Sequence, residues 1–240
     1  MSDPEGPGER SIPMRKGEVR RQAIIDTANQ LFSRKGYLET TVEDILEVLG
    51  CSKGSFYHYF DSKLSVLQAI CEQKVEQSFD RYKQTRVNST REKLNSLLYW
   101  AQPFRPEEEE WLLLILRLRL RGESLVMDGA MRQSQRRLFK PEMENLLMIL
   151  NETGAARVAR PRLDDVVFEA YTAFYDELCE AVMQCARQGR SVAQDVTEVA
   201  EAARFLWERV LDMDYGSMEL IRLDEMLPVL ERIAVRLRGA

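Results

Sequence analysis

The stretch TTVEDILEVLGCSKGSFYHYF, residues 40–60, decides the fold. Thr40 or Thr41 can cap a short helix, because a threonine hydroxyl accepts a hydrogen bond from the first helical turn. Gly50 ends that helix, since glycine readily adopts the left-handed conformation of a helix stop. Ser52 then offers a second cap for the following residues, KGSFYHYF. Four apolar residues recur at helical spacing in the first helix: Val42, Ile45, Leu46 and Leu49.

Two short helices joined by a glycine turn have the geometry that lays one helix in the major groove of DNA. The apolar residues expected to hold the two helices together are Ile45, Leu49, Cys51, Phe56 and Tyr59. The second helix then leaves these hydrogen-bond donors facing outward: Ser52, Lys53, Ser55, Tyr57 and His58. Outward donors suit DNA phosphates and base edges, so this helix is the candidate DNA-binding element.

The flanking residues predict two longer helices. A helix over 17–35 precedes the pair, with Gly36 as its stop and these residues inward: Ile24, Ala28, Leu31 and Phe32. A second helix begins after Asp61 or Ser62 and runs to near residue 84, long enough to connect two domains. Its expected inward residues are Leu64, Leu67, Ile70, Cys71 and Val75.

The rest of the chain is also helical in pattern, and no apolar–polar alternation is long enough to indicate a sheet. We therefore expect an all-α fold. Pro141 could mark a kink or a helix start, and the sequence leaves both open. The expected domains are a flexible tail over 1–16, a DNA-binding domain over 17–78 and a helical domain over 86–240. The helices of the last domain are expected over 90–100, 107–121, 133–152, 163–187, 192–212 and 224–237.

Composition excludes several classes of protein. The chain has 240 residues, of which 45% are hydrophobic and 30% charged, as expected for a folded helical protein. The longest apolar run, WLLLILRLRL, contains Arg117 and Arg119, so we expect no membrane span and no membrane partner. The N-terminus lacks a signal-peptide core, and we expect a cytoplasmic protein. His58 is the single histidine and the cysteines form no C-x-x-C pair, so we expect no metal site, catalytic triad or cofactor.

The segments IIDTANQLFSRKGY (24–37) and TTVEDILEVLGCSKGSFYHYFDSKLSVLQAI (40–70) resemble the DNA-binding domain of the TetR/AcrR family of bacterial repressors. Two positions depart from the family pattern: Leu46 replaces the usual Ala, and Cys51 replaces the usual Val. The residues that carry the resemblance are Ala28, Leu31, Phe32, Lys35, Gly36, Tyr37, Thr40, Thr41, Ile45, Gly50, Ser52, Lys53, Gly54, Tyr57, Tyr59, Phe60 and Lys63.

The resemblance implies a role for each matched residue of the candidate site. Thr41 begins the first helix of the pair against the DNA backbone. The recognition helix opens with Ser52, Lys53, Gly54 and Ser55. Tyr57 and Lys63 would bind phosphates, and His58 would face base edges. The family pattern also turns Tyr59 inward and leaves Tyr57 outside.

The overall charge is unfavourable for nucleic acid, because the pI is near 5.3. The DNA-binding segment is nevertheless balanced, with 11 Lys and Arg against 10 Asp and Glu over 15–85. Binding would therefore depend on a few placed cations: Arg20, Arg21, Lys53 and Lys63.

The C-terminal domain shows no motif. Its aromatic residues are either plain core or the lining of a cavity for a small apolar or amphipathic effector: Trp100, Phe104, Trp111, Tyr171 and Tyr175. The acidic run over 107–110 could bind a cation, but acids also suit the first turn of a helix. Wide apolar stripes on the helices over 163–187 and 192–212 predict a four-helix dimer interface.

The favoured function is a homodimeric transcriptional regulator, a repressor that a small effector releases from a palindromic double-stranded DNA operator. One alternative keeps the DNA-binding domain and gives the C-terminal domain a protein partner. A third is a helical-bundle enzyme acting on a small hydrophobic substrate, although no nucleophile, carboxylate pair or phosphate loop supports it. An apolar cavity would favour the effector, and a filled core would favour the protein partner.

Overall fold

The computed structural model describes residues 16–157, 163–219 and 222–238, and these residues form helices and connecting turns without a strand. The flexible tail expected over 1–16 lies outside them apart from Lys16. The N-terminal part contains α1 (Lys16–Lys35), α2 (Val42–Leu49), α3 (Lys53–Tyr57) and α4 (Lys63–Gln84). The remainder contains α5 (Thr90–Trp100), the 3-10 helix η1 (Pro106–Glu108), α6 (Glu109–Leu120), α7 (Leu125–Glu152), α8 (Leu163–Gln188), α9 (Ala193–Val210) and α10 (Leu223–Leu237).

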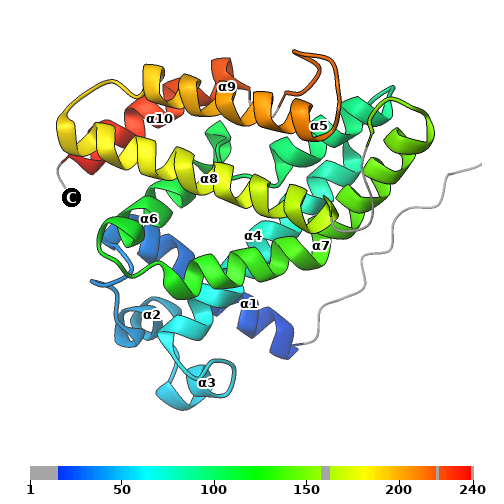
Figure 1. Ribbon diagram of the computed structural model, residues 1–240. Helices are drawn as coiled ribbons and strands as arrows, with labels where there is room; N and C mark the ends of the chain where they lie inside the picture. The colour runs from blue at the N-terminus through cyan, green and yellow to red at the C-terminus, as the bar shows by residue number, and fades with distance from the viewer. Residues whose placement is uncertain (1–15, 158–162, 220–221, 239–240) are drawn as a thin grey trace, which may run out of the picture.

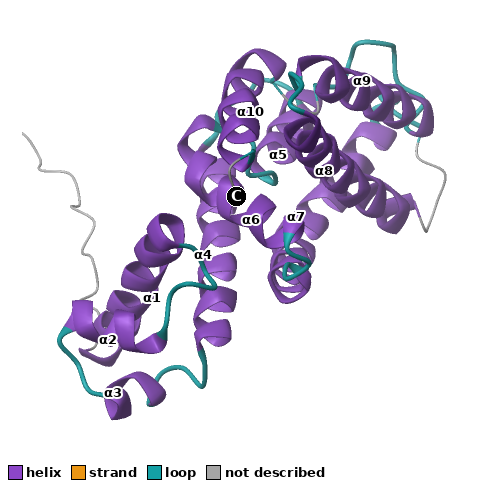
Figure 2. Ribbon diagram, turned by 90° about the vertical axis from the view of Figure 1, so that its left-hand side faces the viewer, coloured by secondary structure: helices purple, strands orange, loops and turns teal. Residues whose placement is uncertain are grey.

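The helices form a small N-terminal group and a larger C-terminal bundle. Figure 1 shows α1, α2 and α3 at the bottom of the molecule, with α8 and α9 side by side across the front of the bundle. In Figure 2, α4 rises from the end of α3 into the bundle. The all-α fold with an N-terminal helix-turn-helix and a C-terminal helical domain is therefore confirmed.

Buried apolar residues form two clusters that meet within α4. The first cluster takes Val66, Leu67, Ile70 and Cys71 from α4 and adds residues of α1, α2 and α3. The second takes Val75 and Tyr82 and extends through α5, α7, α8, α9 and α10. α6 and α7 also reach down into the first cluster, with Trp111, Leu114, Ile115, Leu118, Met127 and Met131. The N-terminal helices thus share their core with two helices of the bundle.

Several details differ from the sequence-based expectations. α3 is shorter than the eight residues expected, because the backbone N–H of Tyr59 bonds to the carbonyl of Phe56 at 2.9 Å and tightens the turn. Leu64 was expected inward but is exposed, so that prediction is wrong. α7 begins at Leu125 instead of residue 133, and Pro141 lies inside it. No helix of the described ranges is long and apolar enough to cross a bilayer.

Candidate DNA-binding site

Thr41, not Thr40, caps α2. The Thr41 hydroxyl accepts the backbone N–H of Asp44 at 3.1 Å, and the Asp44 carboxylate accepts the backbone N–H of Thr41 at 2.6 Å. The hydrogen bond from Lys35 at 2.7 Å is the main reason that the pKa of Asp44 falls to about 2. Thr40 is buried and donates to the carbonyl of Gly36 instead. This reciprocal capping box fixes where the chain enters α2 and leaves Thr41 exposed.

The turn between α2 and α3 has the geometry of a helix-turn-helix. Gly50 has a φ of 58°, a left-handed conformation that costs other residues energy. The next backbone N–H, of Cys51, bonds back to the carbonyl of Leu46 at 3.1 Å. Ser52 then caps α3 by accepting the backbone N–H of Ser55 at 3.3 Å. Leu46 is buried in the first core cluster, so the helices accommodate its bulk.

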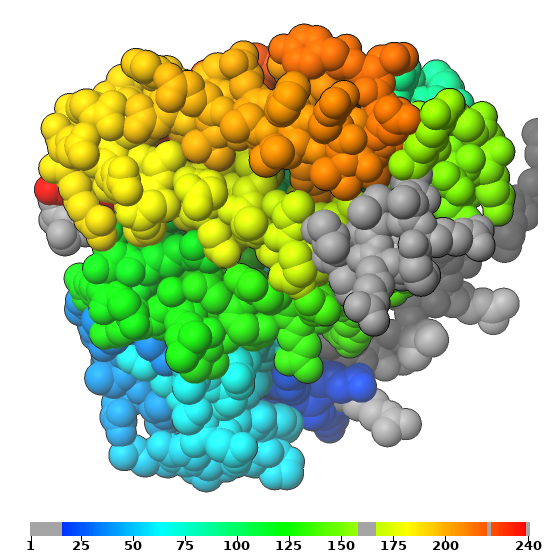
Figure 3. All heavy atoms as spheres, in the orientation of Figure 1, coloured from blue at the N-terminus to red at the C-terminus, as the bar shows by residue number. Residues whose placement is uncertain are grey.

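The side chains of α3 divide into a buried and an exposed set. Phe56 is fully buried, and the half-buried Tyr59 packs against the same cluster. Tyr57 is 53% exposed, so the expectation that Tyr59 turns inward and Tyr57 outward is confirmed. The other candidate residues here are exposed except for the half-buried Ser55: Ser52, Lys53, Gly54 and His58. α3 itself lies at the bottom of the molecule in Figure 1, and the segment around it has the same place in Figure 3.

Lys53 is ion-paired in this structure. Its ammonium lies 2.6 Å from the carboxylate of Glu43 on α2. The hydrogen bond raises the pKa of Lys53 and lowers the pKa of Glu43. Both side chains are exposed, so solvent screens the pair and its strength is modest. Sequence reasoning missed Glu43, because the two residues lie ten positions apart on different helices.

Lys63, which the resemblance assigns to a phosphate, has acceptors inside the protein in this structure. Its ammonium donates to the backbone carbonyls of Tyr37 at 2.6 Å and Thr40 at 2.8 Å, with Leu38 at 3.4 Å. It also lies 4.2 Å from the centre of the Tyr37 ring, and desolvation lowers the pKa of Lys63. An ammonium has three N–H donors, and these internal acceptors occupy them. Lys63 therefore braces the turn before α2 in this conformation, and its contact with a DNA phosphate stays a prediction.

Arg21 is a cation near the end of α3 to which the sequence analysis gave no specific role in the site. It is exposed on α1, and its guanidinium lies 5.0 Å from the centre of the Phe60 ring. Sequence reasoning had counted Arg21 among the available cations, but only the packing of α1 against the end of α3 places it there. Arg20, its neighbour, is half-buried.

The five aromatic candidates for an effector site divide between the two core clusters. Trp111 belongs to the first core cluster, whereas Phe104 and Tyr171 are buried in the second and Trp100 and Tyr175 pack against it. The ring centroids of Phe104 and Tyr175 lie 5.5 Å apart, which is ordinary aromatic packing. α6 turns Trp111 toward the N-terminal helices, and a shared lining for an effector stays a prediction.

Two cavities beside these aromatics are small. One of about 20 Å³ lies beside Trp111 and contains Gln102 and Arg105 in its lining. Another of about 20 Å³ lies beside Tyr175, with Arg119 and Asp176. Each volume holds about one water molecule. The described core is therefore filled at these positions.

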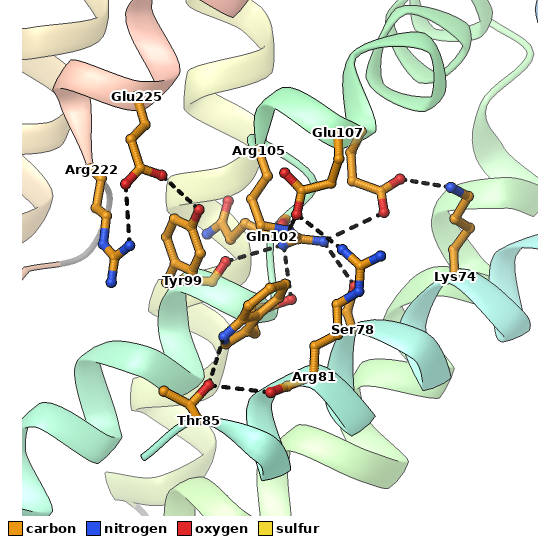
Figure 4. Close-up of polar contacts among 12 residues, drawn as sticks. Lys74, Ser78, Arg81, Thr85, Tyr99, Gln102, Arg105, Glu107, Arg222 and Glu225 are labelled. Atoms are coloured by element: carbon orange, nitrogen blue, oxygen red, sulfur yellow. Dashed lines mark hydrogen bonds and ion pairs between the residues drawn. The ribbon is translucent and has the colours of Figure 1, made fainter. Parts of the chain in front are cut away.

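A buried arginine organises the junction of α4, α5 and η1, as Figure 4 shows. Arg105 is 2% exposed and donates to the carbonyls of Tyr99, Trp100 and Gln102. It also donates to the hydroxyl of Ser78 on α4 at 2.9 Å. Burial lowers the pKa of Arg105. These contacts fasten the end of α5 to the helix that connects the two parts of the molecule.

The acidic run over 107–110 is used by ion pairs. Each carboxylate has a basic partner: Glu107 with Arg81 at 3.0 Å, Glu108 with Lys74 at 2.7 Å, Glu109 with Arg232 at 2.7 Å and Glu110 with Arg236 at 2.6 Å. Within the described ranges, no group of three or more His, Cys, Asp or Glu side chains is arranged to hold a metal ion. The run fastens η1 and α6 to α4 and α10.

A capped helix, a left-handed glycine turn and a second short helix with a polar outer face define a helix-turn-helix domain of the DNA-binding type. The family model described as bacterial regulatory proteins, tetR family, matches residues 24–70. Residues 24–70 therefore form a DNA-binding domain of the tetR-family type.

Curated transcriptional regulators match a short stretch of the chain. The biofilm-operon negative transcriptional regulator IcaR of Staphylococcus aureus is 47% identical over 60 residues, which cover 25% of this chain and 30% of IcaR. The chain thus spans less than a third of the length of the curated relatives it matches.

Similar solved structures extend over most of the chain. A TetR-family regulator from Pectobacterium atrosepticum has a TM-score of 0.61 at 23% identity, covering 83% of this chain and 98% of the other. RolR, solved with the ligand resorcinol, has a TM-score of 0.50 at 21% identity, covering 92% and 95%. At these identities the likeness concerns the fold alone.

Proposed function

We propose that this protein is a sequence-specific DNA-binding repressor that acts as a homodimer on a palindromic operator and is released by a small effector. The observation that carries the proposal is the outward polar face of the capped helix α3. Its exposed donors are joined to a fold whose relatives include the negative regulator IcaR. Repression is proposed because that relative is a negative regulator.

Within the site, we assign different tasks to different residues. Thr41 and Ser52 cap their helices, and both are exposed. The Ser52 hydroxyl can donate to a backbone phosphate, and the Thr41 hydroxyl can do so by exchanging the Asp44 carboxylate, to which it donates at 2.9 Å. Gly54 and Ser55 allow the first turn of α3 to approach the DNA. Tyr57 supplies an exposed phenol for a phosphate.

Base reading falls to Lys53 and His58. Both side chains are exposed on the polar face of α3. Lys53 must exchange Glu43 for DNA when it binds, because its ammonium is ion-paired in the free protein.

The proposed dimer uses α8 and α9. These helices pack together at the front of the bundle, and α9 carries a patch of exposed apolar side chains: Phe205, Leu206 and Val210. Exposed apolar residues that gather on one helix mark interaction surfaces. A two-fold dimer would place two copies of α3 for successive half-sites of a palindrome.

The effector proposal rests on the architecture, since RolR, a neighbour in fold, is solved with resorcinol. The small volume of the cavities beside Trp111 and Tyr175 supports the alternative in which the C-terminal domain binds a protein partner. Catalysis on a small hydrophobic substrate has no comparable support, because the relatives are transcriptional regulators.

Selection of random DNA duplexes with the full-length protein would test the proposal directly. We expect one palindromic sequence to be enriched and to bind far more tightly than a scrambled duplex. Lys53→Ala should cost roughly 1–3 kcal/mol of operator binding, because a bidentate base contact is worth that much. The same substitution should change binding to the scrambled duplex less. Failure to enrich any sequence would contradict sequence-specific binding.

A further inference from the structure

The C-terminal ends of α6, α8 and α10 converge on one hollow. In Figure 1 these ends meet at the left of the molecule, near the end of the chain. The hollow has a volume of about 580 Å³, within the range of small-molecule sites. Its described lining residues are Arg117, Leu120, Arg121, Ala186, Arg187, Gln188, Gly189, Leu237 and Arg238. Four of these are arginines, and none of them is acidic.

Three of the four arginines around the hollow have no close acidic partner among the described residues. The side chain of Arg117 has no hydrogen bond or ion pair with another described residue and only a longer-range attraction to Glu110. Arg187 lies 3.8 Å from Glu180, at the outer limit of an ion pair. Arg238 donates at 2.9 Å to a backbone carbonyl, which carries no net charge. Among the described residues, Arg117, Arg187 and Arg238 therefore give the hollow positive charge with little compensation, whereas Arg121 is paired with Glu39.

Helix dipoles explain only part of this arrangement. Cations are favoured at helix C-termini, so one arginine at the end of each helix needs no ligand. Solvent would satisfy that preference equally well if the arginines pointed apart. Instead, four arginines line the same hollow, and like charges brought together there repel one another. A bound anion would relieve this repulsion.

We propose that this hollow binds a polyanion that carries at least two phosphate or carboxylate groups. A guanidinium group presents a planar fork of donors that matches both kinds of anionic oxygen. Arg117 and Arg187 are the main ligands, because no close acid competes for Arg117 and only a distant one competes for Arg187. Leu120, Leu237 and Ala186 provide an apolar wall for the organic part of such a molecule.

Arg121 connects the hollow to the candidate DNA-binding site. Its guanidinium lies 2.9 Å from the carboxylate of Glu39, in the turn that leads into the Thr41 cap of α2. This hydrogen bond lowers the pKa of Glu39. An anion in the hollow competes with Glu39 for Arg121 and loosens the tie between α6 and that turn. This coupling rests on the proposed DNA-binding function, whereas the anion site itself does not.

Calorimetric titration of the full-length protein tests the site without DNA. The probes are inorganic pyrophosphate and citrate at fixed ionic strength, with any affinity tag at the N-terminus because α10 ends beside the hollow. The double variant R117Q/R187Q should weaken binding about tenfold or more, since each charge-assisted hydrogen bond contributes substantially. The matched control R86Q/R91Q removes two exposed arginines elsewhere and should change the affinity less than about twofold.

The outcomes separate the possibilities. Tighter binding of pyrophosphate identifies phosphate as the preferred group, and tighter binding of citrate identifies carboxylate. Equal losses in both double variants would mean that the anions respond only to net charge, and the proposal would be overturned. Absence of binding to the wild-type protein, with unchanged thermal unfolding at millimolar probe, would overturn it as well.

The coupling has its own readout. The better probe should change the operator affinity of the wild-type protein, and the change should shrink in Glu39→Gln, which has already lost the charged tie to Arg121. If the probe binds but DNA affinity does not respond, the anion site stands and its coupling to DNA is wrong. If no operator exists at all, the calorimetric result still decides the site.

Discussion

At the scale of single residues, two lysines of the helix-turn-helix region have different partners and therefore different expected roles. Lys53 is exposed and pairs with Glu43 through solvent-screened charge, whereas the half-buried Lys63 donates to three backbone carbonyls. The first arrangement is easily exchanged for DNA. The second holds the turn before α2 together, so Lys63 contributes to folding before it can contribute to binding.

Replacing these two lysines should separate stability from binding. Lys63→Met should lower the free energy of unfolding by roughly 1–3 kcal/mol, because carbonyls that lose a charged donor are left poorly satisfied. Lys53→Met should change it by less than about 1 kcal/mol, as expected for an exposed ion pair. Urea denaturation followed by circular dichroism measures both values. Similar losses for the two variants would contradict the bracing role of Lys63.

Removing the acid beside Lys53 should strengthen DNA binding. In Glu43→Gln, Lys53 no longer has to leave a carboxylate 2.6 Å away, and one negative charge is removed from the proposed DNA face. We expect affinity to rise several-fold for operator and scrambled duplexes alike, with a steeper salt dependence. Fluorescence anisotropy at two salt concentrations measures this. A suitable control is Glu47→Gln, an exposed acid of α2 without an ion pair to Lys53.

Local signals explain which parts of the site the sequence could predict. The caps Thr41 and Ser52 and the turn at Gly50 depend on neighbours within three or four residues, so their spacing is visible in the sequence. The pairing of Lys53 with Glu43 depends on how two helices cross. The position of Trp111 depends on which way α6 faces, and no local pattern specifies that.

At the scale of elements, two glycines on helices have opposite consequences. Gly50 ends α2 with a φ of 58°, a backbone conformation that residues with a Cβ adopt only under strain. Gly129 lies inside α7, is exposed, and has open space where a Cβ would be. α7 continues through Gly129 and begins at Leu125, eight residues before the start expected from the sequence at residue 133.

Alanine substitutions at the two positions should therefore move stability in opposite directions. Gly50→Ala should destabilise the protein by roughly 1–2 kcal/mol because of its left-handed backbone. Gly129→Ala should stabilise it by about 0.5–1 kcal/mol because alanine favours the helix and meets no neighbour. Thermal unfolding of the two single variants measures both effects. A destabilising Gly129→Ala would mean that this turn of α7 is not helical in solution.

At the scale of the whole molecule, the division into two domains is incomplete. α4 contributes buried side chains to both clusters, and α6 and α7 fill part of the N-terminal core. Composition and periodicity predicted the all-α class and the connecting helix. They could not predict the shared core, because it arises from packing of α1, α2, α3 and α4 against helices that lie much later in the chain. A rearrangement of α6 or α7 would therefore also change the packing of the core on which α3 rests.

The assembly of the molecule provides the last test. Phe205 and Leu206 are 56% and 60% exposed on α9, and in the proposed dimer the partner would cover them. Leu206→Glu would place an uncompensated charge from each subunit in that interface, so dimerisation should weaken at least about tenfold. The matched control is Leu125→Glu, because Leu125 is 83% exposed at the start of α7, outside the proposed interface.

Sedimentation equilibrium over micromolar concentrations measures the dimerisation of both variants. Operator affinity should fall together with dimerisation in Leu206→Glu, since a monomer holds only one half of a palindrome. The Leu125→Glu variant should remain dimeric and bind the operator normally. If Leu206→Glu stays a dimer with full operator affinity, the exposed face of α9 is not the interface, and the copies of α3 must be paired through another surface.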